Sequence, residues 1–593
     1  MSNIINWLLW PGAFLLSQVG ITPDSTFEVS LTLIISLFAW GFILRTCYFW
    51  IGGWLGLAEP AHFRYFLFVP WRPLYRLWMP IYDWLTDRKP ERRSNSRFAG
   101  APESMCLTYK RGNFYIGRLA IEGVQTSQAI SIPLRKHATV VAGTGAGKST
   151  IAAMWLDHPG GSIVVDPDGQ LSNVGHHRRG EGTDGVPGMG LKTFLLDPKN
   201  QVEGVPSNIW NPMDEMAAAV KRTNDPNAAV DIAQTIANAL VVTPKSSNPY
   251  FADSAREWFV GLLLYCFVAE PPENRHLARV RDLMMFGLPE KTPPPENGKK
   301  FDPFNVLLFH MKKRTEYDGL IAKRAHGLER GSAGGSGDVM STLSKQLAWL
   351  DLISVRNTLN GPSDFTLEMF KTDRCHLGIC APLSDVRKTL APWFRVLIQL
   401  TVTVFSTTKK RMRYPCLLLV DEMPSLQIEG LDVIAPTMRK HGLRLISICQ
   451  HISQLKFYKD NWENFISEAS AVIWMGTEHT GTLKYLSDKL GKRTHDEKVK
   501  KSWFSKREKA YRRIDQPLMD PDQLRRFLDP DKSNIIITRF SKRPIKAKNP
   551  RYYNEKPVYA YTIDPLHSEK IGRAFTRFLL RKLFRKPQIK ITS

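Results

Sequence analysis

The stretch Ala142–Ser149 reads AGTGAGKS and constrains the fold of this chain more than any other. An apolar run typical of a buried strand, ATVVA at Ala138–Ala142, precedes it, and a helical pattern, TIAAMWL, follows it. Glycines here let backbone N–H groups fold around phosphate oxygens, while Lys148 would reach the β- and γ-phosphates and the Ser149 hydroxyl would ligate Mg²⁺. The predicted nucleotide-binding residues are Gly143, Thr144, Gly145, Ala146, Gly147, Lys148, Ser149 and Thr150. We therefore expect ATP and Mg²⁺ as cofactors; a Gly-rich turn that binds no nucleotide is the alternative.

Short apolar, β-rich runs recur along the chain and alternate with helical stretches. Besides Ala138–Ala142, they are Ser162–Asp166, Thr193–Asp197, His376–Cys380, Cys416–Asp421, Leu443–Cys449 and Ala471–Met475. Such nearly continuous apolar runs are typical of parallel strands that are buried on both faces. Several end in Asp, at the carboxyl end of the strand, where open α/β sheets bind their ligands. The sequence thus predicts an α/β fold with a mostly parallel sheet.

The interval between Asp197 and Cys375 has no strand pattern of similar quality. It contains helical patterns instead, such as Ala228–Val242 and Ala252–Val268. We expect an all-α domain inserted into the sheet.

Two adjacent acids, Asp421 and Glu422, follow the apolar run PCLLLV. A nucleotide-hydrolysing site needs one carboxylate to hold Mg²⁺ and one to activate water. We assign the metal to Asp421 and the attacking water to Glu422. Adjacent acids after a strand also occur at helix caps, so the assignment depends on the phosphate-binding loop. Lys148 and Asp421 are 273 residues apart, too far for a simple crossover, which again requires an inserted domain.

Two further residues are candidates for catalysis. Gln450 follows the next predicted strand, where its amide would sense the γ-phosphate; a Gln that merely caps the core is the alternative. Arg439 stands eleven residues earlier, in MRKHGLR. Ring ATPases often insert an arginine into a neighbouring subunit's site, but position alone favours a solvated charge.

The amino-terminal end of the chain has the composition of a membrane anchor. Residues 1–23 hold no charged side chain, and Val29–Leu44 is a second uncharged run. The length of these apolar runs predicts one or two spanning helices. A signal peptide is the alternative, but its basic start and small-residue cleavage site are missing. Basic residues follow position 45, which places the bulk of the chain in the cytoplasm. His62–Leu85 is either a segment on the lipid surface or an aromatic core helix.

The charge of the chain indicates the kind of partner. Lys and Arg number 81 against 56 Asp and Glu, a formal net charge of +25, which favours nucleic acid or phospholipid as partner. The very basic stretch Lys484–Arg513 is expected to be a mobile surface loop. Lys570–Lys586 is expected to be a basic amphipathic helix.

Together these motifs resemble the type IV coupling proteins, the TraG/TraD-like ATPases of conjugation and type IV secretion. The resemblance runs from about residue 1 to 555 and follows the family's order. The stretches that carry it are VAGTGAGKST, SIVVDPDGQ, FLLDP, SNIWNPMDE, LLLVDEMPSL, RKHGLRLISICQHISQL, PLMDPDQLRRF and ITRFSKRPIKAKNPRYY. The pairing of DEMPSL with RKHGLR and Q-x-x-x-Q-L is its most specific part.

The resemblance implies a RecA-like nucleotide-binding domain, an all-α domain, an N-terminal transmembrane anchor and a homohexameric ring. It also implies that Arg439 acts as an arginine finger, that Gln450 acts as a sensor, and that DNA or protein is handed to a secretion channel in the bacterial inner membrane. One departure is Asp166-Pro-Asp168-Gly-Gln170, where relatives tend to carry D-x-K-G-E. The lysine and glutamate of that pattern are replaced here by Asp168 and Gln170.

The expected domains follow from these boundaries. They are a membrane anchor at 1–60, a basic and aromatic segment with linker at 61–103, a nucleotide-binding domain at 104–211 and 366–566, an inserted all-α domain at 212–365, and a C-terminal helix at 567–593.

The predicted function is that of a membrane-anchored hexameric ATPase, the coupling protein of a type IV secretion or conjugation system. It would bind DNA without sequence preference, a relaxase, or effector proteins. Two alternatives stay open: an FtsK-like DNA pump, and a nucleotide-binding receptor or scaffold that scarcely hydrolyses ATP. The second carboxylate, Glu422, argues against the scaffold.

Overall fold

The computed structural model describes residues 96–100, 103–104, 107–110, 112–121, 124–149, 157–167, 169–183, 186–243, 249–293, 301–330, 335–426, 428, 431, 437–498 and 511–549. The predicted anchor, the segment His62–Leu85 and the C-terminal helix Lys570–Lys586 lie outside these ranges. Within the ranges, no helix is both long enough and apolar enough to cross a membrane.

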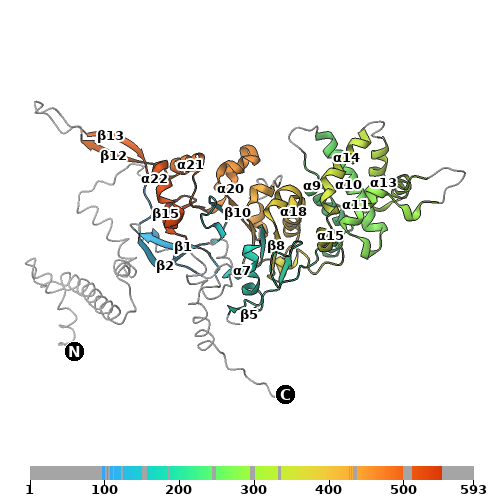
Figure 1. Cartoon of the computed structure of the whole chain (residues 1–593), viewed down its shortest axis with the longest axis horizontal. Coiled ribbons are helices and arrows are strands. Elements are labelled where there is room, and N and C mark those ends of the chain that lie inside the picture. The colour runs from blue at the N-terminus through green and yellow to red at the C-terminus, as the bar shows by residue number, and fades with distance from the viewer. Residues whose placement is uncertain are drawn as a thin grey trace, which may run out of the picture.

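An eleven-stranded mixed sheet lies at the centre of the molecule, in the order β2-β1-β15-β14-β11-β3-β10-β9-β4-β8-β7 (Figure 1). Its strands are β1 (Phe114–Ile121), β2 (Val124–Ile132), β3 (His137–Val141), β4 (Ser162–Pro167), β7 (Thr193–Leu196), β8 (His376–Ala381), β9 (Cys416–Val420), β10 (Leu443–Cys449), β11 (Ala469–Trp474), β14 (Asn534–Arg539) and β15 (Lys542–Lys548). The seven strands from β11 to β7 are parallel, and they are the seven that the sequence predicted. The predicted α/β fold with a mostly parallel sheet is confirmed.

Both faces of the parallel part are buried, which is why its strands read as continuous apolar runs. In β9, Leu418 and Val420 pack into one core cluster, whereas Leu417 and Leu419 pack into the other. The alternation follows the two-residue period of a strand. Each face of the sheet therefore has its own hydrophobic layer.

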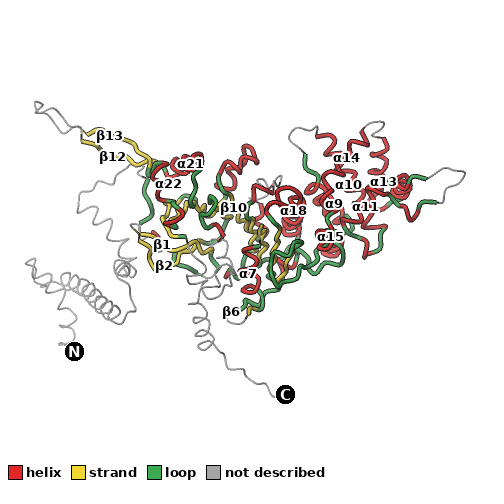
Figure 2. The backbone as a smooth tube through the Cα atoms, in the orientation of Figure 1, coloured by secondary structure: helices red, strands yellow, loops and turns green. Residues whose placement is uncertain are grey.

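A group of helices separates β7 from β8 in the chain. They are α8 (Asp214–Thr223), α9 (Ala228–Leu240), α10 (Pro249–Ala269), α11 (Leu277–Phe286), α12 (Pro303–Lys312), α13 (Glu316–Arg330), α14 (Gly335–Leu347), α15 (Ile353–Leu359) and α16 (Met369–Thr372). Among the described residues between these two strands there is no further strand, as the sequence predicted. α9 to α15 gather at one end of the long axis of the molecule, away from the antiparallel edge of the sheet (Figures 1 and 2).

A buried carboxyl group stands where the chain enters these helices. Glu215 Oε1 accepts hydrogen bonds from the Leu367 backbone N–H at 2.7 Å and from Trp210 Nε1 at 3.4 Å. Glu215 has no exposed surface, and this burial raises its pKa to about 7. The contact ties the first helix of the insertion to the segment that returns to the sheet.

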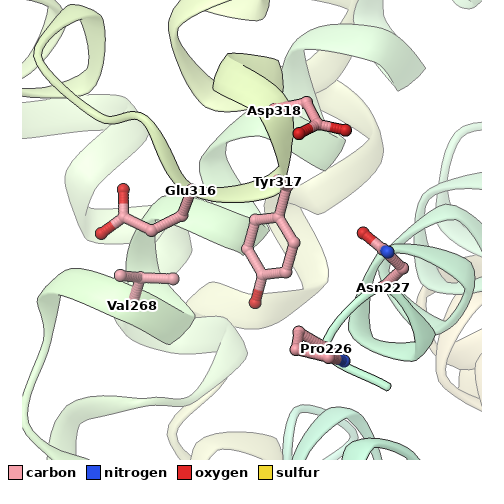
Figure 3. Close-up of a pocket in the computed structure, with 6 residues that line it drawn as sticks. All are labelled: Pro226, Asn227, Val268, Glu316, Tyr317 and Asp318. Atoms are coloured by element: carbon pink, nitrogen blue, oxygen red, sulfur yellow. The ribbon is translucent and has the colours of Figure 1, made fainter.

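The helical domain also contains a pocket of about 370 Å³ at a kink in α13 (Figure 3). Tyr317 and Asp318 both have φ of 55°, in the left-handed region that is costly for non-glycine residues. The Tyr317 ring extends toward Val268 and Pro226 (Figure 3). The pocket is built from the helical domain alone and lies apart from the carboxyl edge of the sheet.

The antiparallel edge and its neighbours were not predicted. β14, β15, β1 and β2 form this edge, and two small hairpins stand outside the sheet: β5 (Gly182–Thr183) with β6 (Val186–Pro187), and β12 (Lys492–Lys498) with β13 (Tyr511–Pro517). The remaining helices of the sheet layers are α7 (Gln170–Arg179), α17 (Leu383–Asp385), α18 (Ala391–Thr407), α20 (Asn464–Ser467), α21 (Thr480–Leu490) and α22 (Pro521–Phe527).

The prediction of a loop over Lys484–Arg513 was wrong for the described part of that stretch. Its first residues belong to α21, and β12 then pairs antiparallel with β13 from Lys492↔Pro517 to Lys498↔Tyr511. The hairpin projects at the end opposite the helical domain (Figure 1). The charge of this stretch does not prevent its backbone from pairing as a strand, so charge alone was a poor guide here.

Candidate functional site

The predicted phosphate-binding loop leaves the carboxyl end of β3 at the middle of the sheet. The Ala142 N–H donates to Cys449 O at 2.9 Å, and the Gly143 N–H donates to Gly476 O at 2.7 Å. A Cβ on Gly143 would lie 2.7 Å from the Gly476 oxygen, so only glycine fits. Gly145 and Gly147 have φ of 76° and 82°, which glycine adopts without strain. The glycine spacing of the motif is therefore required by the backbone.

The carboxyl ends of β9 and β10 bring the predicted acids and amide to the same edge. β10 lies between β3 and β9, with Cys449 level with Val141 and Ser447 level with Val420. Residues that follow β9 and β10 must therefore meet there, beside the loop that follows β3. Asp421, Glu422 and Gln450 are those residues.

Glu422 is the centre of this cluster. Lys148 Nζ lies 3.0 Å from Glu422 Oε2 and 4.0 Å from Asp421 Oδ1. Gln450 Nε2 donates to Glu422 Oε1 at 3.0 Å. The Glu422 side chain is only 3% exposed, so its charge is compensated by the lysine and the amide rather than by water. Sequence-predicted residues from three distant segments thus form one hydrogen-bonded group.

The backbone at Glu422 is strained. Its φ is 51°, a left-handed value that a residue with a side chain rarely adopts. The Asp421 side chain accepts the Glu422 N–H at 2.9 Å, and the Asp421 N–H donates to Val165 O at 3.0 Å. Strain of this kind is retained where surrounding contacts fix a side chain in a functional orientation.

Oxygen donors suited to Mg²⁺ lie at the same edge. Ser149 lies in the first turn of the helix after the loop, which begins at Lys148, and Asp421 has a side chain that is 13% exposed. A hydroxyl and a carboxylate are ligands that Mg²⁺ prefers, and the cation keeps several waters besides. Ser149 and Asp421 therefore fit the predicted Mg²⁺. Thr150, which was predicted to contact the nucleotide, lies outside the described residues.

Gln454 supports Gln450, and sequence analysis gave it no role. Its Oε1 accepts the Gln450 backbone N–H at 2.8 Å. The spacing Q-x-x-x-Q was the available signal. Burial, together with the nearby Glu422 carboxylate, raises the pKa of the preceding Cys449 thiol to about 12, so this cysteine stays protonated.

Asp166, in the stretch that departs from the family pattern, caps α7 rather than joining the cluster. Its Oδ2 accepts the Ser172 N–H at 2.7 Å. Burial, with a contribution from Asp421, raises its pKa to about 8. Asp168 is outside the described residues, and Gln170 is the first residue of α7.

Arg439 is not near the cluster of its own chain. It begins the short helical turn Arg439–His441, just before the amino end of β10, and its backbone oxygen accepts Arg444 Nη1 at 2.9 Å. Gln450 follows the opposite end of that strand, and seven residues at 3.3 Å each span about 23 Å. Arg439 is exposed. A role in catalysis would have to be played in a neighbouring subunit, as the finger hypothesis requires.

Asn549 was also missed. It follows β15 and contacts the phosphate-binding loop, with Nδ2 3.3 Å from Gly147 O. The sequence stretch AKNPRYY was among the family-like motifs, but nothing in it indicated a contact 402 residues away.

Comparisons with known proteins bear on the fold and on the family of this chain. A comparison with curated proteins found no significant match in sequence. Solved structures of the conjugative coupling protein TrwB do share the fold. The unbound TrwBΔN70 has a TM-score of 0.54 at 15% identity and covers 79% of this chain and 96% of its own. TrwB with ADP and Mg²⁺ has a TM-score of 0.53 at 15% identity, covering 77% and 93%. TrwB with the non-hydrolysable ATP analogue ADPNP has a TM-score of 0.51 at 15% identity, covering 77% and 97%.

The sequence itself matches the family described as Type IV secretory system Conjugative DNA transfer over residues 91–574, most of the chain. The family that the motifs predicted is confirmed. This chain belongs to the conjugative DNA-transfer family of type IV secretion systems, the type IV coupling proteins.

Proposed function

We propose that this protein is a membrane-anchored, homohexameric ATPase that serves as the coupling protein of a type IV secretion or conjugation system. It lies in the bacterial inner membrane with its bulk in the cytoplasm. It uses ATP hydrolysis to deliver DNA, a relaxase–DNA complex or effector proteins to the secretion channel. The observation that carries the proposal is the joining of Lys148, Glu422 and Gln450 beside a glycine loop of the required geometry.

Nucleotide binding is assigned to the loop and to the oxygen donors beside it. The N–H groups of the loop bind the phosphates, and Ser149 and Asp421 hold Mg²⁺, which when bound neutralises charge on the phosphate oxygens. TrwB, which shares the fold, has been solved with ADP and Mg²⁺. The donor set of this chain suits the same ligands.

Lys148 and Glu422 would act as a pair that nucleotide separates. Lys148 neutralises Glu422 at 3.0 Å in the geometry described. The phosphates of ATP compete for the same ammonium group, because they carry more charge than one carboxylate. Once Lys148 turns to the phosphates, Glu422 Oε2 is released and accepts a proton from the attacking water. The Gln450 amide continues to hold Glu422 Oε1. Because Gln450 directly follows β10, a movement of the Glu422 side chain would be transmitted to that strand.

The ring and the anchor follow from the resemblance and from the position of Arg439. In a head-to-tail ring, one face of each subunit meets a different face of the next. Arg439, at the edge of the sheet opposite the loop, would then reach the nucleotide of a neighbour. Residues 1–60 supply the anchor, and residues 212–365 supply the inserted all-α domain. The excess of basic residues, 81 Lys and Arg against 56 Asp and Glu, supports binding of DNA without sequence preference.

The test is hydrolysis by the full chain purified in detergent from its own membrane. Phosphate release is expected with ATP and Mg²⁺, and it should be lost in Lys148→Ala but retained in Lys136→Ala. Lys136 also pairs with a glutamate, Glu468 at 3.3 Å, but at the other edge of the sheet. Proteins and nucleic acid that co-elute would identify the cargo. Absence of hydrolysis with intact nucleotide binding would favour a scaffold instead.

A further inference from the structure

Asn549 stands at a junction between the antiparallel edge of the sheet and the phosphate-binding loop. Its Nδ2 lies 3.3 Å from Gly147 O and 3.5 Å from Ala146 O. The residue is 8% exposed, and its backbone N–H donates to Ser533 O at 2.7 Å. Both strands that carry this contact, β14 and β15, are paired to each other up to Asn534↔Lys548. The amide is therefore held against the loop by the sheet.

The contact determines which way two peptide groups of the loop point. In a trans peptide, the C=O of one residue and the N–H of the next point in opposite directions. The carbonyls of Ala146 and Gly147 face Asn549. The N–H groups of Gly147 and Lys148 consequently face the other way, away from Asn549.

These N–H groups belong to the part of the loop that cradles phosphate oxygens. Gly147 has φ of 82°, and a glycine changes its backbone orientation at small cost. A loop built on glycines therefore needs a partner outside itself to keep its N–H groups aligned before nucleotide arrives. Asn549 is in the position to be that partner.

We propose that Asn549 is a positioning residue for nucleotide binding, which aligns the Gly147 and Lys148 N–H groups by holding the carbonyls behind them. The inference rests on the proposed function, namely that the loop binds ATP. An amide is suited to the role because it donates to carbonyls, whereas a carboxylate of the same shape only accepts and adds negative charge near the phosphates.

The chain offers a matched control on the same two strands. Asn534 Nδ2 also donates to a backbone carbonyl, that of Phe527 at 2.9 Å. That carbonyl belongs to α22 and not to the loop. Asn534→Ala thus removes the same kind of bond from the same unit without touching the peptide groups of the phosphate-binding loop.

The experiment compares full-length wild type, Asn549→Ala, Asn549→Asp and Asn534→Ala by titration with a fluorescent ADP and by steady-state ATP hydrolysis. Thermal midpoints without nucleotide are measured in parallel. Asn549→Ala should raise Kd and KM about threefold to tenfold, the worth of one such hydrogen bond, with kcat little changed. Asn549→Asp should raise them further. Asn534→Ala should leave Kd and KM unchanged even if it lowers the thermal midpoint as much.

Two results would overturn the inference. One is wild-type affinity in both Asn549 variants. The other is an equal loss of affinity in Asn549→Ala and Asn534→Ala, which would mean a general effect on the edge of the sheet. Failure of wild type itself to bind nucleotide would instead remove the proposed function, and the two failures are distinct.

Discussion

Gln450 Nε2 donates to Glu422 Oε1 at 3.0 Å, so the residues that follow two neighbouring parallel strands, β10 and β9, are joined at the carboxyl edge of the sheet. The other oxygen of Glu422 is held by Lys148 at 3.0 Å. A carboxylate with both oxygens engaged is a poor base. We expect the phosphates of ATP to draw Lys148 away from Oε2, which would strengthen Glu422 as a base.

Glu422→Gln should retain nucleotide binding and lose turnover. The amide keeps the shape of the side chain but cannot accept a proton from water, and general bases contribute on the order of 10²–10⁴ in rate. Binding is measured by fluorescent ADP and turnover by phosphate release. Glu468→Gln, which alters a surface ion pair with Lys136, is the control and should keep full activity. Normal turnover in Glu422→Gln would show that the two acids were assigned wrongly.

Arg439→Ala should leave nucleotide affinity unchanged and abolish turnover of the assembled ring. A finger acts on the neighbour's nucleotide, and such an arginine contributes on the order of 10³–10⁵ in rate. Arg439→Lys should not restore activity, because an ammonium group cannot form the planar bidentate contact. Lys440→Ala, at the next exposed position, is the control.

Mixing Arg439→Ala chains with Lys148→Ala chains tests the same idea directly. Mixed interfaces would combine an intact loop with an intact finger, so some hydrolysis should return although neither parent has any. A co-assembled mixture as inactive as its parents would mean that Arg439 acts within its own chain or is structural.

Single-stranded DNA should bind the full chain without sequence preference and with strong salt dependence. Each neutralised phosphate of a single strand contributes a slope of about −0.7 in log K against log salt. Lys492→Ala with Arg493→Ala, both exposed on the hairpin, should reduce the slope by about 1.4. The control is Lys221→Ala with Lys323→Ala, two exposed residues of the helical domain, which should leave the slope unchanged. Binding that ignores salt would favour a receptor for protein substrates only.

Glu215→Gln should flatten the dependence of folding stability on pH. The pKa of Glu215 is raised from 4.5 to about 7 by burial, so the folded state holds a proton that the unfolded state has released. Stability is therefore lost as pH rises from about 4.5 to about 7, by up to about 1.4 kcal/mol per unit. The variant should gain on wild type across that window, as measured by urea denaturation of nucleotide-free protein. The control Glu203→Gln alters an exposed carboxylate and should show no such gain in stability over wild type.

The parallel half of the fold was readable from the sequence because burial on both faces leaves a simple pattern. β9 reads CLLLV and β10 reads LRLISIC, and the residues after them are the chemical groups of the site. The glycine loop was readable for a related reason, since backbone geometry at Gly143 and Gly147 admits no other residue type cheaply.

Within the antiparallel edge, β15 could not be predicted from the sequence. β15 is KRPIKAK, whose only apolar signal is Ile545 and Ala547, both buried. Its strand state comes from its partners β1 and β14, and a pattern within seven residues does not contain that information. Asn549 was missed for the same reason, and the separation of Arg439 from the loop became visible only with the strand order.

The strand order also has a consequence for how the protein is made. Thr139 and Ser447 share a hydrogen bond of 3.0 Å between β3 and β10, yet they are 308 residues apart. At roughly 5–20 residues per second, the ribosome needs about 15–60 s to synthesise the chain between them. Throughout that time β3, the strand that precedes the phosphate-binding loop, has neither of its neighbours in the finished sheet, β10 and β11. A nascent coupling protein therefore has no complete nucleotide site until at least 450 of its 593 residues have been translated, because Gln450 and the strand before it come only then.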